Sequence, residues 1–133
     1  NLDIEDICDT YTKEIRSLLE LAVPVWHSGL TVKQSRDIER IQKIALYIIL
    51  GDNFLNYDVA CTLLTIEPLD VRREQLCLSF AKKNVKQTNS LLTPVSSQVN
   101  TRSKDIVLEP KCNYKRFRNS CIPYLSRLLN KNV

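Results

Sequence analysis

Hydrophobic and polar positions alternate at helical spacing over most of the first 87 residues. Apolar residues recur every three or four positions in residues 3–22, 31–50, 56–64 and 68–86, a period that predicts amphipathic α-helices. A last helix is predicted from about residue 123 to residue 129. Because the chain has only two glycines, which disfavours turn-rich β-structure, we expect an all-α fold: a small bundle of about four to five helices.

Residues that commonly begin or end helices mark the boundaries of these segments. Thr31 and Gln34 fit a capping box at the start of the second segment, and Gly51 is placed to end it. Asn56 is a good N-cap for the third segment. Pro24 is expected to stop or kink the first helix.

The predicted helix over residues 68–86 has an apolar face and a basic face. Its apolar face is expected to hold Val71, Leu76 and Phe80, with Cys77 as a further candidate. Its outer face is expected to carry five cations: Arg72, Arg73, Lys82, Lys83 and Lys86.

The composition changes after residue 87. Residues 88–110 are rich in Ser, Thr, Asn and Gln and have no long apolar period. We expect an extended or disordered linker there, with one short strand at residues 105–108. The predicted organisation is a helical domain over residues 1–87, this linker, and a basic segment with a C-terminal helix over residues 111–133 that packs back on the bundle.

The net charge of +4 hides an asymmetry between the two halves. Residues 1–67 hold 6 Lys+Arg against 11 Asp+Glu, a balance of −5, and residues 68–133 hold 13 against 4, a balance of +9. One interpretation is a lopsided solvated surface, and the other is a C-terminal half that faces a polyanion.

The cysteines and the N-terminus bear on the compartment. The chain has five cysteines, an odd number, and no two lie closer than nine positions. The N-terminal residues are acidic and do not form a signal peptide, so we expect reduced thiols and an intracellular protein, nuclear or cytoplasmic. The longest apolar run, residues 44–50, is too short for a membrane span. Since the chain has no methionine, we expect a piece of a longer protein.

No combination of residues in the chain predicts catalysis. There is no pair of closely spaced Cys or His residues of the kind that structural zinc sites use. His27 is the sole histidine, and neither an activated thiol nor a serine elbow accompanies it. The two glycines cannot form a phosphate-binding loop. We therefore expect no catalytic residue, no metal and no cofactor in this segment.

A nucleic-acid interface is the strongest chemical candidate. Tyr114 and Phe117 interleave with cations, and phosphates attract Lys and Arg while unstacked bases stack on aromatic rings. The alternative is that the two rings pack their segment onto the core. The candidate phosphate-binding positions are Lys82, Lys83, Lys86, Lys111, Lys115, Arg116 and Arg118.

An ordered set of motifs resembles a known family. Residues 15–27 (IRSLLELAVPVWH) resemble the motif found downstream of the polymerase core in reverse transcriptases of non-LTR retrotransposons, the jockey-like LINE elements. Similar segments follow in the same order at residues 38–43 (IERIQK), 48–51 (IILG), 69–77 (LDVRREQLC) and 114–125 (YKRFRNSCIPYL). The set covers nearly the whole chain. Leu21 and Tyr47 depart from it, because the family usually has Tyr at the first position and often a basic residue at the second.

The resemblance implies the polymerase thumb and the short domain that follows it. The parent would be an RNA-directed DNA polymerase whose catalytic aspartates lie upstream, in the palm, so the segment is expected to be inactive alone. The implied partners are RNA, DNA or an RNA–DNA hybrid and the palm domain of the parent, with self-association through exposed apolar helix faces as a further expectation. The motif positions are Arg16, Pro24, Trp26, His27, Arg72, Arg73, Glu74, Pro123 and Tyr124.

Two alternatives remain open at this point. Arg72 and Arg73 can belong to an internal ion-pair network and not to a binding surface. The chain as a whole can be a stand-alone helical protein-interaction module, a co-opted remnant of a retrotransposon, that binds its partner through a groove.

Overall fold

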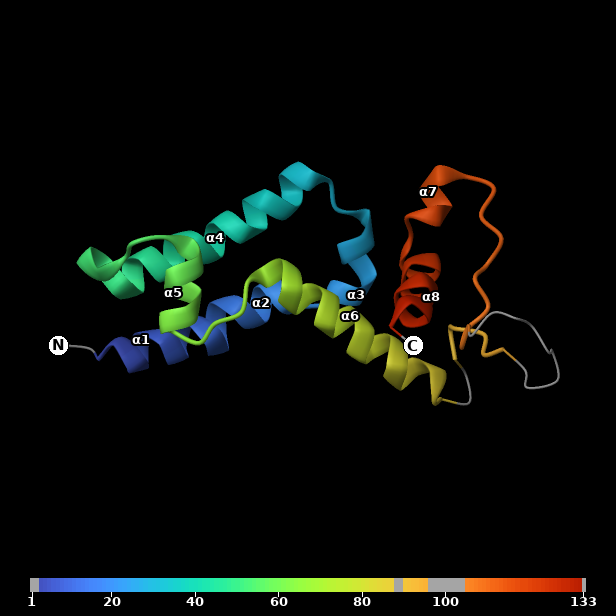
Figure 1. Cartoon of the computed structure of the whole chain (residues 1–133), viewed down its shortest axis with the longest axis horizontal. Coiled ribbons are helices and arrows are strands. Elements are labelled where there is room, and N and C mark those ends of the chain that lie inside the picture. The colour runs from blue at the N-terminus through green and yellow to red at the C-terminus, as the bar shows by residue number, and fades with distance from the viewer. Residues whose placement is uncertain (1–2, 88–89, 96–104, 133) are drawn as a thin grey trace. The chain divides into compact units, whose positions relative to one another are not determined.

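A computed structural model of the chain describes residues 3–87, 90–95 and 105–132. Helices are the regular elements in these ranges, and one isolated antiparallel bridge joins Pro94 and Val107 (Figure 1). The all-α prediction is confirmed. The chain divides into two compact units, Asn1–Val23 with Leu30–Arg73 (unit 1) and Pro24–Gly29 with Glu74–Val133 (unit 2). The domain boundaries predicted at residues 87 and 110 rest on composition and stay predictions.

The first helical segment of unit 1 is interrupted twice. It consists of α1 (Ile4–Thr10), a π-helical stretch (Tyr11–Arg16) and α2 (Ser17–Glu20). It ends before the proline that was expected to end it, because Ala22 has a φ of 53° and turns the chain. A break in the first helix close to Pro24 is therefore confirmed, but its assignment to Pro24 is wrong. Pro24 lies inside the short helix α3 (Val23–Trp26), which a 3-10 turn (His27–Gly29) follows.

The second helix begins and ends where its sequence signals predict. In α4 (Val32–Leu50), the Gln34 backbone N–H donates to Thr31 Oγ1 over 3.2 Å, and the Thr31 N–H donates to Gln34 Oε1 over 2.9 Å. Gly51 ends the helix with a φ of 52°, a conformation that costs a residue with a side chain about 1–2 kcal/mol. Both the capping box and the glycine stop are confirmed.

Helix α5 (Tyr57–Leu63) has a capping group at each end. The Asn56 side chain accepts from the Val59 N–H over 2.9 Å, as predicted. At the other end the Ile66 N–H donates to the Cys61 carbonyl over 2.9 Å, and Thr65 takes a φ of 55°. This is a Schellman turn with Thr in the position that glycine usually takes. It turns the chain toward Glu67.

The core of unit 1 joins the first helical segment to α4, α5 and the turn after α5. Its buried apolar side chains pack as one cluster. The members are Tyr11, Leu46, Ile49, Leu50, Ala60, Cys61 and Ile66.

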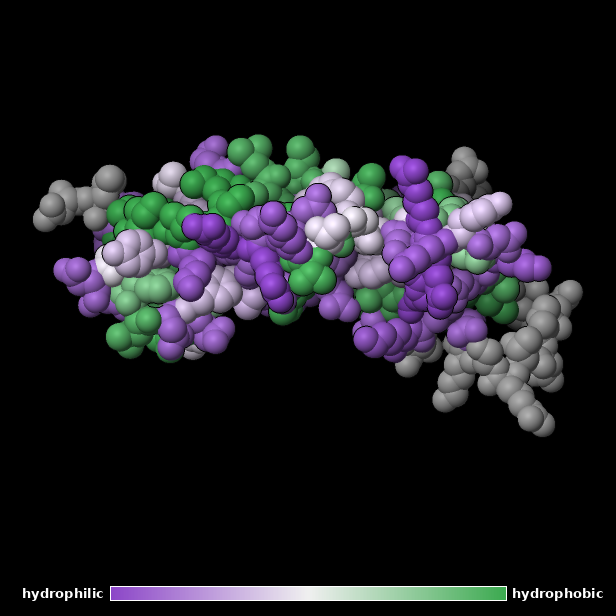
Figure 2. All heavy atoms as spheres, turned by 90° about the horizontal axis from the view of Figure 1, so that it is seen from above, coloured by the Kyte–Doolittle hydropathy of each residue, from purple (hydrophilic) through white to green (hydrophobic). Residues whose placement is uncertain are grey.

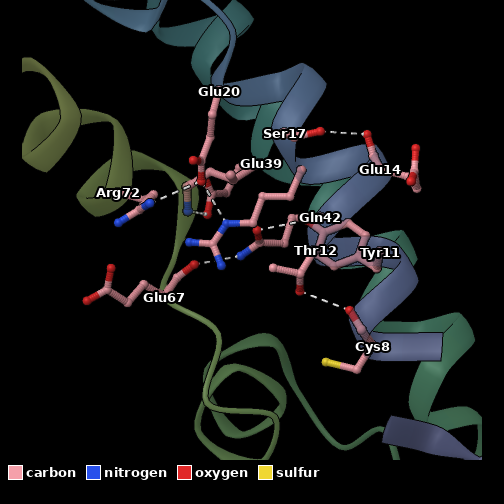
Figure 3. Close-up of polar contacts among 12 residues, drawn as sticks. Cys8, Tyr11, Thr12, Glu14, Ser17, Glu20, Glu39, Gln42, Glu67 and Arg72 are labelled. Carbon is pink, nitrogen blue, oxygen red and sulfur yellow. Dashed lines mark hydrogen bonds and ion pairs between the residues drawn. The ribbon is translucent and has the colours of Figure 1, made fainter. Parts of the chain in front are cut away.

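A polar residue lies fully buried beside this core. The Gln42 side chain is 0% exposed, and it accepts a hydrogen bond from the Tyr11 hydroxyl over 2.9 Å. Its Nε2 donates to the Glu67 carbonyl over 2.9 Å (Figure 3), and it also donates to the Tyr57 hydroxyl over 3.0 Å. The Tyr57 hydroxyl donates in turn to Glu39, whose Oε1 also accepts from the Leu69 N–H. Gln42 therefore connects four segments of unit 1.

We expect Gln42→Leu to destabilise unit 1 by about 2–3 kcal/mol. Leucine has a similar volume, but it leaves the buried Tyr11 hydroxyl without its acceptor, which costs about 1–3 kcal/mol, and it removes both hydrogen bonds that Nε2 donates. Urea denaturation followed by far-UV circular dichroism measures the difference. Lys33→Leu, on the exposed first turn of the same helix, is the matched control and should change stability little. Equal stability of Gln42→Leu and the native chain would contradict the role of this network.

Unit 2 is built from α6 (Leu69–Val85), whose first turn lies in unit 1, and from α7 (Lys115–Arg118) and α8 (Cys121–Lys131). The last helix begins two residues before the predicted start, with Ser120 as its N-cap, and Pro123 is buried in its first turn. The buried apolar side chains of this unit come from α6, α8 and the segments between them: Cys77, Ala81, Leu92, Val107, Leu125, Leu128 and Leu129.

The segment before α7 is extended and fixed to α8. Asn130 accepts from the backbone N–H groups of Ile106 and Val107 over 3.0 and 3.2 Å, and its Nδ2 donates to the Val107 carbonyl over 2.9 Å. The strand predicted at residues 105–108 is wrong, because the pairing with residues 93–95 amounts to a single bridge. Residues 88–89 and 96–104 of the predicted linker lie outside the described residues.

Candidate nucleic-acid interface

The last turn of α6 and the residue just after its end present three lysines to solvent. Cys77, Ala81 and Asn84 recur at spacings of four and three and form the buried face of the helix. Three lysines lie outside that face and are exposed, as predicted: Lys82, Lys83 and Lys86.

The rest of α6 corrects the predicted assignment of its faces. Val71 and Phe80, expected in the core, are 46% and 37% exposed, and Arg73, expected at the surface, is 0% exposed. In the first turns of the helix the buried positions are Leu69 and Arg73, on either side of Val71. Cys77, the further candidate for the apolar face, is buried as expected. The prediction for Val71 and Phe80 was wrong because it ranked residues by how apolar they are, whereas the neighbouring segments cover less apolar residues such as Arg73.

The basic and aromatic segment forms a second exposed group. Tyr114 is the N-cap of α7, and its ring is 77% exposed, while Phe117 is 43% exposed. Neither residue is among the buried residues of the core, and Phe117 is the more covered of the two. The four cations of the segment are also exposed: Lys111, Lys115, Arg116 and Arg118.

Arg127, on α8, holds both ends of this segment, and no local pattern in the sequence indicated it. Its Nη1 forms an ion pair with Glu109 Oε1 over 3.0 Å, just before the basic residues. Its Nη2 donates to the carbonyl of Arg118 over 2.7 Å, at the end of α7. Since Glu109 lies 18 positions from Arg127, neither helical spacing nor a motif could have predicted the pair. Glu109 is also the carboxylate nearest to Lys111 in the sequence, and its ion pair is with Arg127 and not with Lys111.

The seven predicted cations are not neutralised within the part of the chain that the structure describes. Its ion pairs are Lys13–Asp9, Arg16–Glu20, Arg72–Glu20 and Arg127–Glu109, and none includes a candidate cation. The sequence of unit 2 holds 11 Lys+Arg against 3 Asp+Glu, a balance of +8, whereas unit 1 holds 8 against 12, a balance of −4. All seven cations lie in the positive unit.

The cations fall into two groups and not one patch. Figure 1 shows α7 beyond the first turn of α8, while the last turn of α6 lies toward the opposite end of α8. Lys82, Lys83 and Lys86 belong to the second location. A bound polyanion that touches both groups must therefore extend along unit 2.

Three arginines of the motifs, Arg16, Arg72 and Arg73, form polar contacts within unit 1. Arg16 and Arg72 both pair with Glu20 Oε1, at 2.8 and 3.2 Å (Figure 3). Arg73 donates from Nη2 to Ser35 Oγ over 2.7 Å, and its Nε and Nη1 have no hydrogen-bond partner among the described residues. The ion-pair interpretation therefore holds for Arg72. Arg73 is instead fully buried, with a hydrogen bond to Ser35. The acidic motif position, Glu74, is exposed.

The motif residues Pro24, Trp26, His27, Pro123 and Tyr124 belong to unit 2, where two of them are in contact. The rings of His27 and Tyr124 pack edge to face with centroids 5.5 Å apart. Pro123 is buried next to Tyr124 in the sequence, and Pro24 and Trp26 are less buried than it. Burial, with smaller contributions in the same direction from the charges of Cys77 and Glu74, raises the pKa of Tyr124 to about 12.

The raised pKa of Tyr124 predicts alkaline destabilisation of unit 2. An unfolded tyrosine loses its proton near pH 10, whereas the folded one holds it to about pH 12. The stabilisation is complete below pH 10 and is lost as the pH rises from about 10 to about 12. We expect the free energy of unfolding to fall over this range in the native chain and to fall less in Tyr124→Phe. Urea denaturation at pH 9, 10, 11 and 12, followed by Trp26 fluorescence, tests it; parallel curves for both proteins would contradict it.

The described residues contain no group of three or more His, Cys, Asp or Glu side chains that could hold a metal ion. None of the five cysteines forms a disulfide bond. Within the described ranges, no helix combines the length and the apolar character that crossing a bilayer requires.

Comparison with known proteins adds no relative: no family model, no curated protein and no solved structure matches this chain.

Proposed function

We propose that this chain is the thumb and C-terminal segment of a non-LTR retrotransposon reverse transcriptase, and that its unit 2 helps to hold template–primer or target nucleic acid. One observation carries the nucleic-acid part: the seven candidate cations are all exposed, lack an ion-pair partner among the described residues, and lie in the unit with a charge balance of +8. The parent assignment rests on the ordered motifs in the sequence. In this proposal the palm of the parent protein supplies the chemistry.

The two exposed groups would act differently on a nucleic acid. Lysines on α6 can pair with phosphates anywhere along a strand, and such contacts give affinity without sequence preference. On α7 the Tyr114 and Phe117 rings stand among cations, so this group can also stack on unpaired bases. Arg127 would hold the α7 group in place without touching the ligand, because both of its hydrogen-bonding arms are already engaged.

Reversing the charges on α7 should weaken binding to an RNA–DNA primer–template. For Lys115→Glu with Arg116→Glu and Arg118→Glu, we expect a dissociation constant at least about tenfold higher at about 0.1 M salt. The slope of log affinity against log salt should fall by about two to three, because each lost phosphate contact removes about 0.7–0.9. Fluorescence anisotropy over a salt series measures both quantities.

The matched control reverses three cations of unit 1 that form no ion pair among the described residues, Arg36, Arg40 and Lys43, and changes the net charge equally. It should weaken binding less than the α7 variant and keep a steeper salt slope. An α7 variant that binds as tightly as the native chain would remove these residues from the proposed interface.

Replacing the two rings should separate stacking from charge. Tyr114→Ala with Phe117→Ala is expected to lower the affinity for a single-stranded oligonucleotide by about tenfold or more, since stacking contributes about 1–3 kcal/mol per base. The salt slope should stay unchanged, because no cation is lost. An affinity loss confined to duplex, or a changed slope, would contradict stacking by these rings.

A protein-interaction role is the second candidate function. It is favoured by the exposed isoleucines on α4, which lie in unit 1, whereas the seven candidate cations lie in unit 2. A specific protein partner, together with the absence of salt-sensitive binding to nucleic acid, would favour this candidate over the first.

A further inference from the structure

Helix α4 exposes an apolar stripe on the side opposite the core. Gln42, Leu46 and Ile49, at spacings of four and three, are its buried face. Ile41, Ile44 and Ile48 also recur at spacings of three and four, on another side of the helix, and are 44%, 50% and 69% exposed. We call these three residues the α4 stripe. Figure 2 shows hydrophobic surface gathered over the part of unit 1 where α4 runs in Figure 1.

A row of cations runs beside the α4 stripe. Arg36, Arg40 and Lys43 follow each other at spacings of four and three and are exposed, so they share one side of the helix. We call them the basic row. None of them is in an ion pair within the described residues. Two carboxylates lie among these cations in the sequence. Glu39 is partly buried and is engaged by Tyr57 and the Leu69 N–H. Asp37 is exposed and forms no ion pair within the described residues, so the three cations outnumber the one exposed carboxylate.

A hollow adjoins the stripe and the row. Its volume is about 360 Å³, and its walls are Arg40, Lys43, Ile44, Tyr47 and Phe54. The Tyr47 and Phe54 rings meet edge to face at 5.5 Å. A hollow with aromatic walls and a cationic rim can take one large apolar side chain whose neighbour in the ligand is acidic.

We propose that this α4 surface binds an acidic amphipathic α-helix of a partner protein. The apolar side chains of that helix would pack on the α4 stripe and enter the hollow, and its carboxylates would pair with the basic row. The charge pattern selects this occupant, because three cations without a carboxylate partner among the described residues favour an acidic flank. This inference goes beyond the proposed nucleic-acid function and concerns the other unit.

The same charge pattern argues against a second copy of this chain as the occupant. In an antiparallel pair of identical helices, each flank meets the equivalent flank of the other copy. Two copies of α4 would then place one basic row against the other, which costs free energy through like-charge repulsion. A nucleic acid is a poorer match as well, since phosphates would pair with the basic row and leave three isoleucines facing a polar backbone.

The test uses the full chain and a synthetic probe. The probe is a fluorescein-labelled helical peptide of about 18 residues, long enough for about five turns, with leucines on one face and glutamates on its flanks. A matched peptide carries lysines in place of the glutamates. We expect the native chain to bind the acidic probe at least about tenfold more tightly than the basic one in anisotropy titrations.

Two variants locate the binding surface. Ile48→Asn removes an apolar contact without changing charge and should weaken the acidic probe about tenfold, the effect of losing one interface anchor. Leu18→Asn is its control, because Leu18 on α2 is an equally exposed aliphatic residue outside the α4 stripe, at 72%, and should leave binding unchanged. Both positions are exposed, so circular dichroism spectra should match that of the native chain.

Charge reversal gives the decisive readout. Arg40→Glu with Lys43→Glu should lose the acidic probe and gain the basic one, and a gain cannot come from misfolding. The proposal is overturned if the native chain does not distinguish the two probes, or if Leu18→Asn weakens binding as much as Ile48→Asn. It is also overturned if the α4 surface binds something else. The native chain would then not bind the acidic probe, and Ile48→Asn would abolish one of three other interactions: self-association, binding to phosphatidylglycerol vesicles, or binding to primer–template. None of these results bears on the seven cations of unit 2, so the two proposals fail separately.

Discussion

The buried carboxamide of Gln42 holds unit 1 together. An amide has both a donor and an acceptor, so one side chain can satisfy the Tyr11 hydroxyl, the Tyr57 hydroxyl and the Glu67 carbonyl at once. These partners come from the π-helical stretch, α5 and the turn before α6. The apolar contacts around Leu46 and Ile49 supply the greater part of the free energy of burial, but they do not specify one relative placement of the helices. A complete set of hydrogen bonds does, because any other placement leaves a polar group buried without a partner.

Local signals in the sequence predicted the helix ends well and the helix faces less well. The Thr31–Gln34 capping box, Gly51 and Asn56 were predictable because each acts on backbone groups within three or four residues of itself. The face of α6 was not, because neighbours distant in sequence decide which stripe is covered: Arg73 is buried and Val71 is not. Ala22 escaped prediction for another reason. Nothing about an alanine indicates a positive φ, so Pro24 was assigned a role that the residue two positions earlier performs.

The exposure of the cations in the candidate interface was predictable, since it follows from their charge, whereas the sequence left open whether the rings of Tyr114 and Phe117 are exposed. The support of this interface was not predictable. Arg127 and Asn130 both lie on α8 and bind backbone or side-chain groups of the segment before and around α7. Long-range polar contacts of this kind leave no periodicity in a single sequence. The α4 stripe could not be predicted either. The last turns of α4 are apolar on almost every side in the sequence, and only the fold shows which isoleucines are exposed to solvent.

The contacts of Arg127 make the backbone position of the basic segment depend little on the side chains of that segment. It is held at Glu109 and at the carbonyl of Arg118, and one of these two points is a main-chain atom that any residue would supply. The residues between them carry little of the fold, because most of them are exposed. The exposed side chains of this segment can therefore be substituted, and its ligand preference can change with them, while Glu109 and Arg127 keep its backbone in place.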